Sequence, residues 1–255
     1  MELEGALTST VACFHQSTVP RSLLATALLP PLKRPSVGAF SLRSELKEVR
    51  VCTHRTCRKQ GSFQTLETLS GLAPADVSVK TCGCLGRCGS GPNLVLLPEG
   101  VIVSHIGTVA RTARILCDSD ELLLKSLEAL SLRKTASSEL DRGNYSDAVP
   151  LLTQAINLNP VGGVHFMFKD RSIAKLGMSD YDGALEDARE ATKLAPRYIE
   201  GYISEGDALL AMGKLEEAEK SYSICLELDP TIRRSKSFKA RVEKLQEKLA
   251  AANSV

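Results

Sequence analysis

The sequence predicts two folded regions of different class, a compact α/β layer over about residues 45–117 and an all-α array of paired helices over 119–251. Short β-like runs interrupted by amphipathic helical stretches predict the first region. A motif that occurs three times, at an interval near 34 residues, predicts the second region. A chain of 255 residues is long enough for two such domains.

In the first region the predicted order of elements is strand, helix, strand, two-stranded hairpin, helix. Ser62 and Thr108 each precede a helical pattern and are expected to cap it. The second of these helices is expected to run to Cys117. The predicted strands are residues 49–51, 77–79, 94–97 and 101–103, and the last two form a hairpin around a Pro-Glu-Gly turn.

Cysteines gather at the ends of these strands. Cys52 and Cys57 have the spacing C-x4-C, and Cys84 and Cys88 have the spacing C-x3-C. Five of the eight cysteines lie between positions 52 and 88, which is typical of a metal site in a reducing compartment rather than of a disulfide scaffold. Four thiolates from two loops, with glycines between them, can hold a metal ion or an iron–sulfur cluster. These spacings do not exclude zinc.

The segments V-C-T-H-R-T-C-R-K-Q-G-S and C-L-G-R-C-G-S-G-P-N-L-V-L-L-P-E-G resemble the thioredoxin-like [2Fe–2S] ferredoxins and the small cluster-bearing subunit of respiratory complex I. The resemblance covers roughly residues 49–116. It implies a thioredoxin-like fold and a [2Fe–2S] cluster whose ligands are Cys52, Cys57, Cys84 and Cys88. The interval between the two pairs is shorter than in the complex I subunit, and Cys82 is an additional thiol that we expect not to be a ligand. Zinc and a site that has lost its metal are the alternatives.

Basic residues surround the expected ligands. Arg55, Arg58, Lys59 and Arg87 would favour the reduced state of a cluster and attract anionic partners. The alternative is that they are ordinary solvated loop residues. His54 is expected to face solvent, because the sequence has no C-x2-H partner for it.

Internal similarity follows Asp118. The segments Y-S-D-A, Y-D-G-A and L-E-E-A begin at 145, 181 and 215, at steps of 36 and 34, and small residues and prolines further along keep these steps. A period near 34 with small residues at helix crossings and a terminal proline is the tetratricopeptide (TPR) signature. Asp118 and Glu121 are expected to cap the first helix. The predicted helices are 120–141, 145–158, 164–177, 181–194, 198–212 and 215–228, giving three repeats, followed by a capping helix at 232–251.

Residues 164–230 resemble the repeats of co-chaperones that bind the acidic C-terminal tails of heat-shock proteins. In that family Lys, Asn and Arg side chains form a carboxylate clamp. The clamp positions align here with Arg133, Ser137, Asp170, Glu200 and Ser204. Only one positive charge remains, and two carboxylates lie where a carboxylate ligand would bind. We therefore expect that the clamp is not retained and that its positions prefer a basic or neutral segment of a protein partner.

Residues 5–44 contain no Asp or Glu and are rich in Ser and Thr, with a few basic residues. This composition predicts an organelle transit peptide over residues 1–44. The many hydroxyl residues and few arginines favour the chloroplast, either its stroma or the periphery of the thylakoid, over the mitochondrion. A disordered tail without targeting function is the remaining alternative.

Charge and motifs limit the functions. A formal net charge of +2 does not indicate nucleic-acid binding, and no apolar run is long enough to span a membrane. No nucleotide-binding loop or hydrolase motif occurs, so an enzyme is not expected. The sequence predicts an iron–sulfur protein with a TPR docking domain, engaged in one-electron transfer or redox-linked service to a plastid complex. The alternative is a TPR interaction or assembly factor in which the cluster is structural or redox-sensing.

Overall fold

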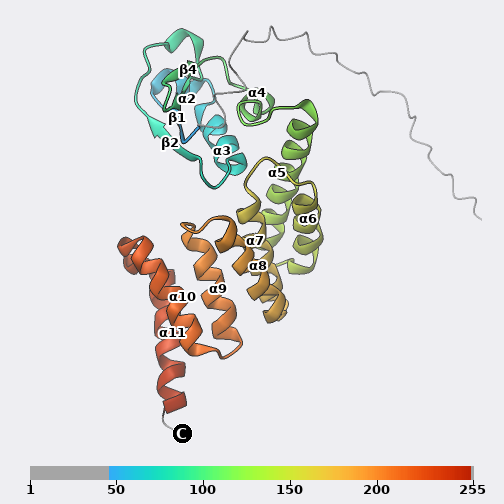
Figure 1. The fold of residues 1–255 in the computed structure, drawn as a ribbon, viewed down its shortest axis with the longest axis vertical. Helices are drawn as coiled ribbons and strands as arrows, with labels where there is room; N and C mark the ends of the chain where they lie inside the picture. Colours follow the sequence, from blue (N-terminus) through green and yellow to red (C-terminus); the bar gives the residue numbers. More distant parts are fainter. Residues whose placement is uncertain (1–45, 254–255) are drawn as a thin grey trace, which may run out of the picture. The chain divides into compact units, whose positions relative to one another are not determined.

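The computed structural model describes residues 46–253, which belong to one compact unit of the chain (Figure 1). The predicted transit peptide, residues 1–44, lies outside the described residues. Between residues 46 and 253, no helix is long and apolar enough to cross a membrane.

A four-stranded sheet forms the first part, in the order β2-β1-β3-β4. Strand β1 (Glu48–Cys52) pairs in parallel with β2 (Ser78–Cys82) and antiparallel with β3 (Leu94–Leu97), which forms a hairpin with β4 (Val101–Val103). The four predicted strands and the hairpin are confirmed, whereas the order of the strands in the sheet was not predicted. Two short elements were not predicted, α2 (Arg55–Lys59) and the 3₁₀ turn η1 (Cys88–Ser90).

Helix α3 (Ser62–Leu72) connects the parallel strands and packs on the sheet. Val49 and Val51 of β1 are fully buried, as are Leu69 and Leu72 of α3. The alternation of β1 therefore points its valines into a core with one face of the helix. The same hydrophobic cluster includes Leu123 and Leu130 of the following helix α5 (Asp120–Asp141).

Two of the predicted helix starts in this region are wrong. The N-cap of α3 is Gly61, at a φ of 94°, and the Ser62 hydroxyl is buried without a hydrogen-bond partner. A left-handed backbone suits glycine, so the cap moves one residue earlier. For α5, the cap is Ser119, whose hydroxyl accepts a hydrogen bond from the backbone N–H of Leu122 at 3.1 Å, and Asp118 lies one residue too early.

The predicted cap at Thr108 is confirmed, since its hydroxyl accepts from the backbone N–H of Arg111. The helix that it begins, α4 (Val109–Ala113), ends before the predicted Cys117. The N–H groups of Ile115 and Leu116 bond carbonyls three residues back, which tightens the chain out of the α-helix.

Antiparallel helices make up the rest of the described chain, from green to red in Figure 1. Their bounds agree with prediction to within one residue at each end, apart from the last helix. After α5 they are α6 (Tyr145–Asn157), α7 (Val164–Gly177), α8 (Tyr181–Leu194), α9 (Ile199–Ala211) and α10 (Leu215–Leu228).

The capping helix begins later than predicted. Residues Pro230–Arg234 form a separate 3₁₀ turn, η2, and α11 spans Lys236–Asn253. Ser235 has extended backbone dihedrals, with φ −67° and ψ 129°, so the turn cannot continue into the helix. The predicted start at residue 232 is therefore wrong.

Small residues are required where the paired helices meet. The repeated positions Ala148, Ala184 and Ala218 are fully buried. A Cβ added at Gly206 would lie 2.4 Å from the ring of Tyr222. The small residues of the repeat thus permit close approach of adjacent helices, as the sequence pattern indicates.

Candidate functional site

The four predicted ligand cysteines lie at one end of the sheet. Cys52 ends β1 and Cys57 lies in α2, and both are buried. Cys84 lies in the loop after β2 and Cys88 begins η1, and both are exposed. All four are free thiols.

The sulfur atoms form two pairs. Cys84 Sγ and Cys88 Sγ are 3.4 Å apart. Cys52 lies close enough to Cys57 to raise the pKa of its thiol. The backbone N–H of Gly86 points to Cys84 Sγ at 3.4 Å. The glycine-containing loop thus turns an amide donor toward a thiolate, as expected from its composition.

In each pair at least one thiol has a pKa that differs from its ordinary value. Burial, followed by the hydrogen bond with Cys52, raises the pKa of Cys57. The hydrogen bond from Gly86, followed by that with Cys88, lowers the pKa of Cys84. The neighbouring Cys84 raises the pKa of Cys88, with smaller contributions from Cys57 and Cys52. The two pairs therefore lie within electrostatic reach of each other.

Asn93 connects the loop that carries Cys84 and Cys88 to Cys57 through hydrogen bonds. This role was not predicted from the sequence. Its side-chain amide donates to the carbonyl oxygen of Arg87 at 2.8 Å and to Cys57 Sγ at 3.5 Å, so it joins the two cysteine loops. It is 1% exposed, and its Oδ1 has no hydrogen-bond partner among the described residues. The sequence contains this residue in the G-P-N segment, but its burial is seen only in the structure.

Gly91 provides the space beside this sulfur. A Cβ added there would lie 3.0 Å from Cys57 Sγ and 2.2 Å from Oε1 of Gln60. The position therefore admits only glycine without a shift of its neighbours.

This arrangement fits a dinuclear cluster. A [2Fe–2S] cluster with four cysteine ligands needs two thiolates for each iron, whereas zinc needs four ligands around one ion. Among residues 46–253, no group of three or more His, Cys, Asp or Glu side chains lies together as metal ligands do, and this finding does not distinguish zinc from a cluster. Two separate thiol pairs match the first requirement.

Cys82 lies beside the pairs. It is partly buried at the end of β2 and is paired in register with Cys52 across the parallel strands. Burial, followed by the proximity of Cys52, raises its pKa. Strand β2 ends at Cys82 and the chain bends at Gly83, so Cys82 and Cys84 do not lie on one extended segment.

The basic residues predicted around the ligands are all exposed. The guanidinium of Arg58 lies over the ring of Phe63, 5.1 Å from its centroid, and Phe63 is itself 49% exposed. His54 is exposed at the N-terminus of α2, as predicted. Arg55, Lys59 and Arg87 are exposed as well, so this end of the sheet is positively charged.

The positions of the aligned carboxylate clamp lie on α5, α7 and α9, the first helices of the three helix pairs. Arg133 Nε and Asp170 Oδ2 are 2.8 Å apart, and Lys169 also binds the Asp170 carboxylate. The guanidinium of Arg133 lies 4.7 Å from the centroid of the Phe166 ring. The one clamp position that keeps a positive charge is thus engaged by a buried carboxylate of the same surface.

The helical array is a tetratricopeptide-repeat domain, and residues 170–231 match the tetratricopeptide repeat family. Protein STIP1 homolog of Dictyostelium discoideum is 35% identical over 104 residues, 41% of this chain and 18% of that protein. Heat shock protein STI1 of Saccharomyces cerevisiae is 30% identical over 122 residues, 48% of this chain and 20% of that protein. The chain thus spans about a fifth of the length of these relatives.

A phosphatase and a solved TPR structure are also similar to this chain. Human serine/threonine-protein phosphatase 5 is 31% identical over 102 residues, which are 40% of this chain and 20% of the phosphatase, so its activity is not transferred to this chain. The solved structure of the first TPR of Spaghetti (RPAP3) bound to the HSP90 peptide SRMEEVD is 27% identical. It covers 49% of this chain and 95% of that chain, with a TM-score of 0.44.

Proposed function

We propose that the protein is an interaction or assembly factor whose TPR domain binds a segment of a partner protein. The observation that carries this proposal is the array of three helix pairs with its small residues buried at every crossing. Such arrays present side chains of successive helices along one surface, which suits an extended ligand. The matches to Protein STIP1 homolog and Heat shock protein STI1 support this role over one-electron transfer.

The proposal includes a [2Fe–2S] cluster on a thioredoxin-like domain. Cys52 and Cys57 would hold one iron, and Cys84 and Cys88 the other. Such a cluster supplies one-electron redox chemistry. Around it the chain provides the buried amide of Asn93 and a positively charged surface, and both favour negative charge on the sulfur atoms.

In the preferred function the cluster is structural or senses redox state, so that its loss changes partner binding. Electron transfer is the second candidate. The exposure of Cys84 and Cys88 favours it, because one edge of a cluster held there would be open to a redox partner. The positive charge of the neighbouring arginines would then favour an acidic partner.

For localisation we propose the plastid, in the stroma or at the periphery of the thylakoid, with the mitochondrion as the alternative. The support is the acid-free, hydroxyl-rich composition of residues 5–44. Residues 1–44 fused to a fluorescent protein should direct it to plastids. Diffuse cytosolic fluorescence would refute both locations.

The cluster is tested by purifying the full chain without oxygen. We expect two irons and two sulfides per chain, visible absorption, and an EPR signal after one-electron reduction. The Cys84→Ser variant should lose most of the iron. Stoichiometric zinc in a colourless protein would refute the cluster and leave the interaction role intact.

The interaction role is tested by cross-linking mass spectrometry of the full chain in a plastid extract. A partner that uses the repeats should cross-link to lysines of the helical array such as Lys169 and Lys244. Cross-links confined to the sheet region, together with electron exchange between chain and partner, would favour the electron-transfer candidate instead.

A further inference from the structure

We infer that Cys84 and Cys88 are a modification site of the chain before a cluster is inserted: they react with an anionic low-molecular-weight disulfide, such as glutathione disulfide, and form a disulfide with each other. This bond prevents loading of the cluster. That consequence rests on the proposed cluster site, whereas the reaction itself does not. Three features of this end of the sheet support the site: the distance between the two sulfur atoms, their exposure, and the charge around them.

The two sulfur atoms lie close enough to bond after a small movement. Cys84 Sγ and Cys88 Sγ are 3.4 Å apart. A disulfide bond is about 2.05 Å long, so a relative shift of roughly 1.4 Å joins them. The proximity that lets two thiolates bind one iron therefore also favours a bond between the two sulfurs.

The loop that carries both cysteines has room for this shift. Gly83, Gly86 and Gly89 lie beside or between the two cysteines, and a Cβ added at any of them would meet no atom within 4 Å. Gly86 has a φ of 77°, a left-handed conformation that glycine adopts without strain. The backbone of the loop can therefore rearrange without displacing packed neighbours at these positions.

Exposure restricts the reaction to this pair. Cys84 and Cys88 are exposed, whereas Cys52 and Cys57 have exposed fractions of 1% and 2%. Thiol–disulfide exchange requires access of the reagent to the attacking sulfur, and a buried thiol does not allow this access. A reagent of the size of glutathione disulfide therefore distinguishes the two pairs.

The surface around the pair attracts anions. Arg87 lies in the loop between the two cysteines, and Arg55, Arg58 and Lys59 of α2 are exposed at the same end of the sheet. Glutathione disulfide is negatively charged at neutral pH, because its carboxylates outnumber its ammonium groups. Positive surface charge raises the local concentration of such an anion, and it gives no such advantage to an uncharged disulfide.

The reaction has two steps in which atoms and electrons balance. The backbone N–H of Gly86 points to Cys84 Sγ at 3.4 Å and stabilises a thiolate there, which assigns Cys84 as the attacking sulfur. Cys84 bonds to one sulfur of glutathione disulfide, and the first glutathione leaves. Cys88 then attacks Cys84 Sγ, which forms the intramolecular bond and releases the second glutathione. Each leaving glutathione takes up the proton of the attacking thiol. The two cysteines lose two electrons, which reduce one glutathione disulfide to two thiols.

The bond removes two of the four expected cluster ligands. A cysteine binds iron as a thiolate, and a sulfur atom in a disulfide no longer carries that charge. Reduction restores both thiols. The ratio of glutathione disulfide to glutathione therefore controls whether the chain accepts a cluster.

The test treats the full chain, reduced and freed of metal by a chelator, with glutathione disulfide in the absence of oxygen. Trypsin cleaves after Lys80 and Arg87, so the bond should join peptides 81–87 and 88–111 in mass spectrometry. Cys52 and Cys57 should remain free thiols that an alkylating reagent labels after unfolding.

Three serine variants assign the sulfur atoms. Cys82→Ser is the matched control, because it changes the other cysteine of peptide 81–87, and it should still form the joined species. Cys84→Ser should not form it. Cys88→Ser should stop at the first step and retain one glutathione on Cys84.

Two rate measurements test the role of charge. Arg87→Glu should react at least about threefold more slowly with glutathione disulfide than the native chain does. With the uncharged 2-hydroxyethyl disulfide the two chains should react at the same rate. Equal rates with both reagents would overturn the assigned preference for an anionic disulfide.

Cluster uptake is measured by transfer from a [2Fe–2S] scaffold protein, which needs no added reductant. The oxidised chain should receive less than about a tenth of the iron that the reduced chain receives. Thiols that stay free in glutathione disulfide, a bond to Cys82 instead of Cys84, reaction of Cys52 and Cys57 at the same rate, or full cluster uptake by the oxidised chain would overturn the inference.

The outcomes separate this inference from the proposed function. If the disulfide forms but the reduced chain accepts no cluster, the cluster proposal fails and the modification site stands. If the reduced chain accepts a cluster and no disulfide forms, the proposed function stands and the inference fails.

Discussion

Replacing Asp187 by alanine removes a carboxylate that is 2% exposed and bound by two cations. Its Oδ1 lies 2.7 Å from Nη2 of Arg171, and its Oδ2 lies 2.8 Å from Nε of the same residue and 2.9 Å from Nζ of Lys175. The bidentate pair joins α8 to α7, the two helices of the second repeat.

The expected loss of stability follows from what remains after the substitution. The side chains of Arg171 and Lys175 are 16% and 18% exposed, so two mostly buried cations would lose their carboxylate. They would keep only neutral acceptors, the hydroxyl of Thr153 and the carbonyl oxygen of Gly183. Removing one partner of a buried ion pair typically lowers the free energy of unfolding by about 3–5 kcal/mol. Because the two cations are partly exposed, we expect a loss of about 3 kcal/mol here. For a protein of this size, the unfolding temperature should fall by roughly 6–12 °C.

Urea unfolding followed by far-ultraviolet circular dichroism measures the effect. The control is Glu186→Ala, the exposed neighbour on the same helix, which should change stability by less than about 0.5 kcal/mol. In a double-mutant cycle, Arg171→Met should cost much less in the Asp187→Ala background than in the native chain. A loss below about 1 kcal/mol, or additive effects of the two substitutions, would refute the reasoning.

The remaining predictions concern the thiols, the clamp positions and pH. Cys82→Ser should keep its iron and an unchanged EPR line shape, and an altered line shape would mean that the ligand set is wrong. A fluorescent peptide ending in an acidic pair with a free carboxylate should not bind saturably, and micromolar binding that Arg133→Ala abolishes would restore the clamp. Burial, followed by the charge of Arg133, lowers the pKa of His165 to about 4, so the unfolded chain takes up its proton first as pH falls. Stability present above about pH 6.5 should therefore decline by about 2 kcal/mol toward pH 5, and His165→Gln should flatten that decline in urea titrations. Gly91→Ala should lower the iron content, because its Cβ would lie 3.0 Å from Cys57 Sγ, whereas Gly89→Ala, which meets no atom within 4 Å, should retain the iron.

The helical array was predictable from sequence because its information is local and repeated. Each helix carries its own apolar periodicity, and the small residues Ala148, Ala184 and Ala218 mark the crossings at a nearly constant interval. The strands of the sheet were also predictable, since alternation and turn residues delimit them. Helix ends were less predictable, because the position of a cap depends on the backbone dihedral angles of a single residue. The left-handed Gly61 displaced Ser62 as the N-cap, and the extended Ser235 delayed α11.

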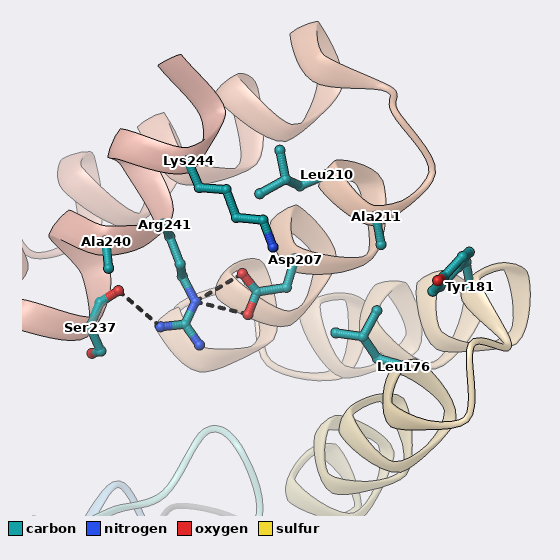
Figure 2. A pocket seen from close by; sticks show the side chains of 9 residues that line it. All are labelled: Leu176, Tyr181, Asp207, Leu210, Ala211, Ser237, Ala240, Arg241 and Lys244. Carbon is teal, nitrogen blue, oxygen red and sulfur yellow. Dashed lines mark hydrogen bonds and ion pairs between the residues drawn. The ribbon is translucent and has the colours of Figure 1, made fainter. Parts of the chain in front are cut away.

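The cysteine spacings identified a candidate site, but spacing alone does not say how thiols separated by about thirty residues are arranged. The two pairs are local in sequence, but only the tertiary structure brings them to the same end of the sheet and places Asn93 between their loops. The ion pair between Asp207 of α9 and Arg241 of α11 (Figure 2) was likewise beyond sequence reasoning, because residues thirty-four positions apart meet only when their helices pack together. The sequence by itself therefore determined the helices, because their apolar periodicity lies within single segments. The tertiary structure decided which side chains meet, because those side chains come from segments far apart in the chain.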